Sequence, residues 1–146
     1  MRAERPVSDP ARDERFMREA LALAREAAAE GEVPVGAVVV RGDEIVGRGR
    51  NRRETGKTAL AHAELELFVT LEPCPMCAGA AINARLPRVV FGASDPKAGS
   101  CGSVTDLFAL PYNHHPETAG GVLGGECAAV LQDFFRALRE KRAAKQ

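Results

Sequence analysis

Four residues of the types that bind and use zinc lie close together in this sequence. A histidine and a glutamate stand two apart, at His62 and Glu64, and two cysteines stand three apart, at Cys74 and Cys77. Residues three apart share one face of a helix, and the N–H groups at a helix start favour thiolate over thiol. Two thiolates and one imidazole make three zinc ligands and leave a fourth position for water, which is the arrangement of a catalytic zinc site. Glu64 then remains free to carry protons.

The residues around this motif predict the elements that would position it. Residues 67–71 are apolar and partly β-branched, which favours a central strand. Pro73 suits the first turn of a helix, because its missing N–H costs nothing there. Residues 78–86 continue that helix, and residues 88–93 form a second apolar strand. A strand, a helix and a strand in succession imply a parallel crossover.

The flanking segments complete an α/β pattern. Residues 9–30 carry apolar side chains at helical spacing, with Ser8 as the expected N-cap. Residues 35–40 and 45–50 predict two strands joined by a turn, which is a hairpin. A short helix is expected at 104–110 and an amphipathic helix at 126–139.

Length and composition favour one domain without a membrane segment. The chain has 146 residues, with 45% hydrophobic and 27% charged side chains, which is ordinary for a globular domain. We expect a single domain over residues 1–146, with 1–8 and 142–146 flexible. No apolar run approaches the roughly 20 residues that cross a bilayer, and the N-terminus has no apolar signal region. A cytoplasmic location is therefore expected, and the four cysteines indicate metal or redox chemistry rather than a disulfide scaffold.

The charge is balanced overall but unevenly distributed. The formal net charge is zero, so the whole chain shows no general attraction to nucleic acid. Arginines nevertheless cluster at 48, 50, 52 and 53, and basic residues outnumber acidic ones five to one over residues 136–146. Two local basic patches suit a localised phosphate contact. The alternative is a solubilising surface, which for the C-terminal tail is about equally favoured.

Three other candidates have plainer explanations. His114 and His115 invite a metal-binding interpretation, but neighbouring side chains point apart and no third ligand lies nearby in the sequence, so surface histidines are favoured. Cys127 lies on the apolar side of its expected helix and is interpreted as a core residue. Asn51 directly follows the second strand, where an amide serves either as a loop cap or as a reader of a nucleobase edge.

The order His-x-Glu followed by Pro-Cys-x-x-Cys is the signature of zinc deaminases that act on nucleobases. Nearly the whole chain resembles the bacterial tRNA-specific adenosine deaminase family. The similar segments are, in order, 33–38, 51–52, 61–64, 70–74, 76–80, 88–92, 95–97, Gly99 and 126–129.

The resemblance implies a three-layer α/β/α fold of the cytidine-deaminase type, with a mixed sheet, an N-terminal hairpin and parallel later strands. It implies one Zn²⁺ per subunit, bound by His62, Cys74 and Cys77, with Glu64 as the catalytic proton carrier. Asn51 and Pro73 would contact the substrate. The implied substrate is the anticodon stem-loop of tRNA, whose wobble adenosine would become inosine, and the implied assembly is a homodimer.

Deamination of this kind replaces an exocyclic amine with oxygen. Zinc lowers the pKa of a bound water to roughly 7, and the resulting hydroxide attacks C6 of adenine or C4 of cytosine. Glu64 would take the proton from water, deliver it to the ring nitrogen and help ammonia leave. A deaminase of the cytidine or guanine type, a zinc-binding or fold-only protein without turnover, and a Cys-x-x-Cys redox protein remain as alternatives.

One part of the family pattern is absent from this chain. Between His-Ala-Glu and Thr-Leu-Glu-Pro-Cys the family has a helix, a return loop and a strand, whereas here only residues 65–69 intervene. A strand over residues 67–73 would span roughly 23 Å, and residues 64–67 can return at most about 11 Å. Four explanations are open. The strand is shortened, or His62 is displaced from the zinc. Alternatively, His62 and Glu64 are donated by another copy of the chain, or the chain is a deletion variant that is less stable and less active.

Overall fold

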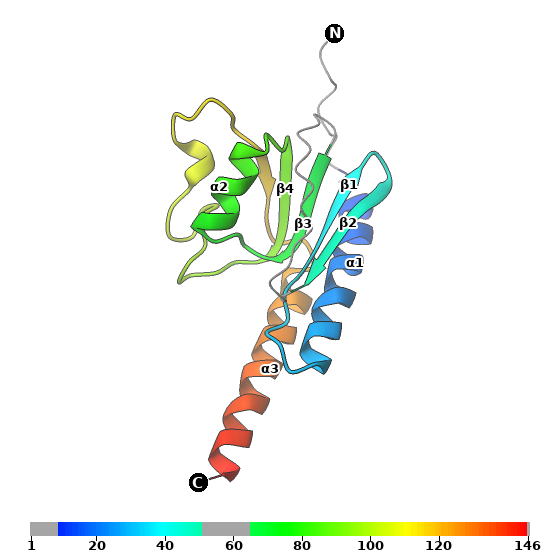
Figure 1. Cartoon of the computed structure of the whole chain (residues 1–146), viewed down its shortest axis with the longest axis vertical. Coiled ribbons are helices and arrows are strands. Elements are labelled where there is room, and N and C mark those ends of the chain that lie inside the picture. Colours follow the sequence, from blue (N-terminus) through cyan, green and yellow to red (C-terminus); the bar gives the residue numbers. More distant parts are fainter. Residues whose placement is uncertain (1–8, 51–64, 146) are drawn as a thin grey trace.

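A computed structural model describes residues 9–50 and 65–145, which form a five-stranded sheet between helices (Figure 1). In spatial order the strands are β2 (Glu44–Arg50), β1 (Gly36–Arg41), β3 (Leu65–Leu71), β4 (Arg88–Ala93) and β5 (Glu117–Ala119). β1 pairs antiparallel with β2 and β3, and β4 pairs parallel with β3 and β5. The predicted N-terminal hairpin, the parallel crossover and the mixed sheet are confirmed. β5 has no counterpart among the predicted elements.

Helices cover both faces of the sheet and make three layers, as predicted. Side chains of successive strand residues point to opposite faces. One face packs against α1 (Pro10–Ala29) and the start of α3 (Gly124–Ala144), and the other packs against α2 (Pro75–Asn83) and the short 3₁₀ helix η1 (Leu107–Ala109). In β4, for example, Val90 joins the first core with Phe68 and Met17, while Val89 and Phe91 join the second.

The first layer is fixed by the capping and close approach of α1. Its N-cap is Asp9, whose carboxylate accepts hydrogen bonds from the amides of Ala11 and Arg12 at 3.1 and 3.3 Å. The predicted cap at Ser8 is therefore wrong, because Asp9 stands one residue closer to the free N–H groups of the first turn. Gly36 of β1 lies so near α1 that an added Cβ would be 2.1 Å from the carbonyl oxygen of Ala20. This contact brings the sheet and α1 together.

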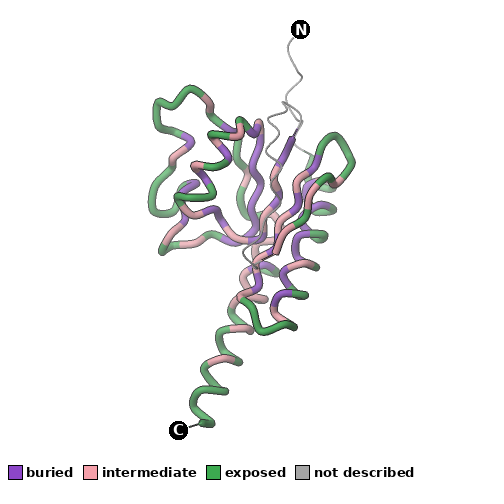
Figure 2. The backbone as a smooth tube through the Cα atoms, viewed as in Figure 1, coloured by how far each residue is buried: buried purple, intermediate pink, exposed green. Residues whose placement is uncertain are grey.

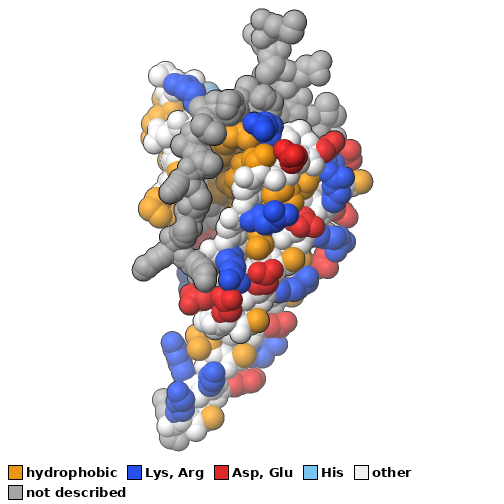
Figure 3. Space-filling model, turned by 45° about the vertical axis from the view of Figure 1, so that its right-hand side comes forward, with side chains coloured by type: hydrophobic (Ala, Val, Ile, Leu, Met, Phe, Trp, Pro, Cys, Tyr) orange, Lys and Arg blue, Asp and Glu red, His pale blue; other side chains and the backbone are white. Residues whose placement is uncertain are grey.

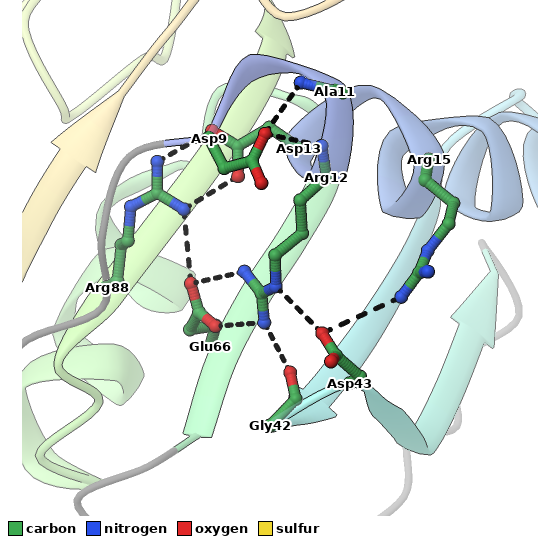
Figure 4. A network of polar contacts seen from close by, with 9 residues as sticks. All are labelled: Asp9, Ala11, Arg12, Asp13, Arg15, Gly42, Asp43, Glu66 and Arg88. Carbon is green, nitrogen blue, oxygen red and sulfur yellow. Dashed lines mark hydrogen bonds and ion pairs between the residues drawn. The ribbon is translucent and has the colours of Figure 1, made fainter.

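A network of ion pairs, buried at Asp13, Glu66 and Arg88, joins α1 to the starts of β3 and β4 (Figure 4). Arg88 donates to both carboxylate oxygens of Asp13 at 2.8 and 2.7 Å and to Glu66 at 3.1 Å. Glu66 also pairs with Arg12 at 2.7 Å, and Arg12 reaches Asp43 in the hairpin turn at 3.1 Å. The hydrogen bond with Asp13 is the main reason that the pKa of Arg88 is raised, and that with Glu66 raises the pKa of Arg12. No buried side-chain nitrogen or oxygen of the described residues lacks a hydrogen-bond partner.

β3 is longer than predicted. It begins at Leu65 rather than at residue 67, directly after the position of Glu64. Leu65 and Glu66 pair with Arg41 and Val40 of β1, and Glu66 is buried because Arg12 and Arg88 neutralise it. The expectation that the short connection is accommodated by a shortened strand is therefore wrong.

The last helix also runs further than predicted, to Ala144 rather than to residue 139. Its first turns pack against the sheet through Cys127, and its second half extends away from the body, with most side chains exposed (Figure 2). Within residues 9–50 and 65–145, none of the helices combines the length and apolar character that a membrane span requires.

Candidate metal centre at the end of β3

The two cysteines of the predicted zinc site lie in the turn between β3 and α2. Cys74 is the N-cap of α2 and has extended backbone angles, and Pro75 follows as the first residue of the helix. The prediction that Pro73 occupies the first turn is therefore wrong by two residues. Pro75 fills that place, since a residue at the first helical position has no use for its N–H. Cys77 stands one turn into α2, on the same side as Cys74, as predicted.

The local electrostatics of this turn favour a thiolate at Cys74. The pKa of Cys74 is lowered, chiefly by the backbone N–H of Cys77, with a further contribution from the N–H of Met76, and against the opposing effect of burial. These are amides of the first turn, which lack partners within the helix. The pKa of Cys77 is raised, first by burial and then by the charge of Cys74. One thiol of the pair is thus easier to deprotonate than the other.

Both cysteines are accessible to a ligand. Cys74 is half-buried, Cys77 is exposed, and neither forms a disulfide. Met76 between them has 79% of its surface exposed. A pair of adjacent thiols at a helix start, one with a lowered pKa, fits the sulfur ligands that zinc prefers.

The remaining predicted site residues divide between two groups. His62, Glu64 and Asn51 lie outside the described residues. Pro73 is buried, and its carbonyl oxygen accepts a hydrogen bond from the amide of Ser100 at 2.8 Å. No group of three histidine, cysteine, aspartate or glutamate side chains suited to a metal is found in the described part of the chain, which contains two of the three predicted ligands.

A glycine-rich loop at residues 95–103, expected from the sequence, packs against this turn in a way that the sequence did not indicate. The loop of residues 95–103 folds around the carboxylate of Glu72, the second residue before Cys74. Burial alone would raise the pKa of Glu72, but hydrogen bonds from the hydroxyl of Ser103 and from three amides lower it below its ordinary value. The signal available in the sequence was a glutamate placed between an apolar strand and Pro-Cys, where a core residue is expected.

The histidines and the other cysteines do not form a second metal site. His114 contacts the carbonyl oxygen of Leu86 at 2.6 Å, and His115 contacts that of Phe108 at 2.8 Å. Each imidazole therefore anchors a loop. Cys101 and Cys127 are buried, and burial is the main cause that raises their pKa values to about 12 and about 11 respectively.

The two basic patches predicted from the sequence differ in their surroundings. In the first, Arg50 pairs with Glu30 at 2.9 Å and with Glu26 at 3.4 Å, and Arg48 lies 3.9 Å from Glu19. Arg52 and Arg53 are outside the described residues. Figure 3 shows Lys and Arg side chains alternating with Asp and Glu on the body and gathering towards the end of α3, where Glu140 is the one acidic residue of positions 136–145. The described part of the first patch is largely neutralised, whereas the end of α3 stays basic.

Comparison with known proteins identifies close relatives of the chain. The sequence model of the cytidine and deoxycytidylate deaminase zinc-binding region matches residues 10–93, and that of the MafB19-like deaminases matches residues 64–139. A tRNA-specific adenosine deaminase of Bacillus subtilis is 44% identical over 151 residues, which cover 90% of this chain and 94% of the relative. A tRNA(Ile)-lysidine synthase of Deinococcus deserti is 48% identical over 145 residues, or 86% of this chain and 27% of that longer protein.

The fold is similar to a solved structure from work on A-to-I editing by tRNA:A34 deaminases at the wobble position of transfer RNA. The TM-score is 0.72 and the sequence identity 36%, over 80% of this chain and 99% of the other. A guanine deaminase from Nitrosomonas europaea, with a TM-score of 0.62 and 23% identity, shares the fold.

The Bacillus subtilis relative also has residues that this chain lacks. The alignment has 151 positions, and it includes about 131 residues of this chain, which is 90% of 146. Roughly twenty aligned positions are therefore occupied only in the relative. That number corresponds to a helix with its loops, the kind of segment that the sequence predicts to be absent after Glu64.

Proposed function

The chain belongs to the tRNA-specific adenosine deaminases of the cytidine and deoxycytidylate deaminase zinc-binding family, and we propose on this basis that it converts adenosine to inosine at the wobble position of tRNA. The overall reaction consumes one water and releases one ammonia. The observation that carries the proposal is the Cys-Pro-Met-Cys turn, which presents two accessible thiols at the junction of β3 and α2, within residues 10–93 that match the family.

We assign Cys74, Cys77 and His62 as the ligands of one Zn²⁺ per subunit. Zinc at such a site lowers the pKa of a bound water to about 7. Glu64 would accept the proton of that water, pass it to the ring nitrogen of adenine and assist the departure of ammonia. The amide of Asn51 would hydrogen-bond the edge of the base, since it has both a donor and an acceptor. Pro73, whose carbonyl oxygen accepts a hydrogen bond from the amide of Ser100, would line the substrate side of the turn.

The anticodon stem-loop is the proposed partner, and the exposed basic end of α3 offers phosphate contacts. We infer a homodimer from the family, and a cytoplasmic location from the place where tRNA is made and used. The deamination is tested by incubating the protein with a tRNA stem-loop that contains a single adenosine at the wobble position. Inosine formation that disappears in Glu64→Ala supports the proposal, and a guanosine or cytidine deaminase activity in its place contradicts it.

The position of β3 favours a second candidate. At about 3.6 Å per residue, the three residues from His62 to Leu65 reach at most about 11 Å. β3 spans roughly 20 Å from Leu65 to Leu71, at about 3.3 Å per residue. The shortness of this connection favours, as a second candidate, a site to which a second copy of the chain contributes His62 and Glu64, or a protein that retains the fold without turnover.

Mixing two inactive variants separates these two functions. His62→Ala lacks the imidazole and Cys74→Ala lacks a thiol, so neither is expected to bind zinc tightly alone. If the ligands come from two copies, unfolding and refolding the two variants together restores zinc binding and activity. In such a mixed dimer, His62 of the Cys74→Ala chain meets Cys74 and Cys77 of the His62→Ala chain. A wild-type protein that has the mass of 15.6 kDa and contains no zinc would instead identify a fold without turnover. One zinc per chain in a monomer would contradict both interpretations of the short connection.

A further inference from the structure

Glu72 is a buried acid that the proposed reaction does not use. It follows the last residue of β3, and its exposed surface is 2%. Its Oε1 accepts hydrogen bonds from the amide of Asp95 at 3.0 Å and from the hydroxyl of Ser103, and its Oε2 accepts from the amides of Cys101 and Ser103 at 2.9 and 3.1 Å. All of these donors belong to the loop of residues 95–103, so one carboxylate organises the whole loop.

The loop is closed tightly around this side chain. Gly99 lies so near that an added Cβ would be 2.3 Å from Cδ of Glu72. Any side chain at this position would collide with the carboxylate. The amide of Gly99 donates to the carbonyl of Asp95 at 2.8 Å, and its own carbonyl accepts from Val104 at 2.9 Å. The loop therefore has the shape of a cradle for one carboxylate.

The backbone of Glu72 and the loop around its carboxylate are both tied to the cysteine turn. The amide of Glu72 donates to the carbonyl of Ala93 at 2.8 Å, and the amide of Ser100 donates to the carbonyl of Pro73 at 2.8 Å. Cys74 is the next residue. The residues before Cys74 are thus held between the end of β4 and the loop, and a movement of the loop would move the thiol.

The charge of Glu72 is balanced by oriented dipoles rather than by a cation. No ion pair joins Glu72 to a lysine or arginine of residues 9–50 or 65–145; three N–H groups and one hydroxyl surround it. A carboxylate accepting several such hydrogen bonds is rigidly oriented, since charge-assisted bonds are stronger than neutral ones. In Glu72→Gln, the side-chain NH₂ group is a donor and would face the N–H and O–H donors of the loop, so these hydrogen bonds would be lost.

We propose that Glu72 is a positioning residue of the metal centre. Its carboxylate fixes the loop of residues 95–103 against Pro73, and the loop in turn fixes the direction of the Cys74 thiol. This inference rests on the proposed function only for the identity of the metal. It concerns how the protein's own residues hold the thiol, and it is measurable without tRNA.

The test compares Glu72→Gln with Asp13→Asn, a matched change at the opposite end of β3. Both replace a buried carboxylate that accepts several hydrogen bonds, but Asp13 pairs with Arg88 and does not contact the cysteine turn. Zinc affinity is measured by competition with a chromophoric chelator at a temperature at which both variants are folded. Loss of a group that orients a ligand typically weakens metal binding by 10–100-fold. We expect at least a tenfold weaker affinity in Glu72→Gln and less than a twofold change in Asp13→Asn.

Two further measurements separate positioning from general stability. Amide hydrogen exchange at Asp95, Cys101 and Ser103 should be faster in Glu72→Gln and unchanged in Asp13→Asn. Ser103→Ala, which removes one hydroxyl donor and keeps the fold, should weaken zinc binding by an intermediate factor of about threefold. The proposal is overturned if both acidic variants bind zinc alike, or if the wild type binds none. A wild type that binds zinc tightly but deaminates no adenosine would contradict the proposed function and leave the role of Glu72 intact.

Discussion

Replacing Arg88 by Met should strongly destabilise the protein. Arg88 has 4% of its side chain exposed, and its two partners, Asp13 and Glu66, have 5% and 3%. Removing one member of a buried ion pair leaves an uncompensated charge and costs about 3–5 kcal/mol. Glu66 keeps Arg12 at 2.7 Å, so the unpaired charge is mainly that of Asp13, for which Arg88 supplies both carboxylate contacts.

The assay is urea unfolding followed by circular dichroism, on metal-free proteins at pH 7. Arg88→Met should lower the free energy of unfolding by about 3–5 kcal/mol at an unchanged m-value. At roughly 3 °C per kcal/mol, the Tm should fall by about 9–15 °C. The control is Arg136→Met on α3, whose pair with Asp133 at 3.0 Å is more than half exposed. A surface pair of this kind contributes about 0–1 kcal/mol.

A double variant shows whether the loss comes from the unpaired carboxylate. Arg88→Met with Asp13→Leu removes both charges and keeps apolar volume, a replacement that is often neutral or stabilising. It should therefore be more stable than Arg88→Met alone. Two results would contradict this account of the ion pair. One is a loss of less than about 1 kcal/mol of unfolding free energy in Arg88→Met. The other is a double variant whose loss of unfolding free energy equals the sum of the losses in the two single variants.

Three further outcomes are expected. Iodoacetamide at pH 8 should modify Cys74 and Cys77 in the metal-free protein. It should spare Cys101 and Cys127, because they are buried and their raised pKa values keep them as thiols. Bound zinc should protect Cys74 and Cys77, and peptide mass spectrometry would detect the difference. Gly92→Ala should destabilise the protein by about 1–3 kcal/mol, because the new Cβ would lie 2.4 Å from Sγ of Cys127. The control Gly79→Ala, whose Cβ would meet open space on α2, should be neutral or stabilising in thermal unfolding. Glu64→Ala should retain zinc, as measured by metal analysis, and lose inosine formation; loss of both would contradict a purely catalytic role.

The elements with strong local patterns were predictable from the sequence. The apolar periodicity of α1, the hairpin pattern and the uncharged run of residues 89–93 in β4 gave bounds within a residue or two of the structure. β5 was missed because it has three residues and is a strand only through its pairing with β4. The start of β3 was missed because Glu66 is charged, and its partners lie 54 and 22 residues away in the sequence.

The candidate site was predictable in its residue types but less so in its supports. The Cys-x-x-Cys spacing placed both thiols at a helix start correctly, yet it assigned the first turn to Pro73 instead of Pro75. Glu72 could not be recognised as an anchor, because its donors come from a loop more than twenty residues later. Local spacing therefore indicates candidate ligands, whereas the groups that would orient them depend on contacts between distant segments.

The outer strand β2 bears on how such a chain avoids self-association. Free backbone N–H and C=O groups along a sheet edge invite pairing with another molecule. β2 carries Glu44, Arg48 and Arg50 along this edge, and a register shift in the β1–β2 pairing interrupts its regularity. Charge and irregularity both discourage the growth of a continuous intermolecular sheet. These two features of β2 therefore act as a safeguard against aggregation at this edge of the sheet.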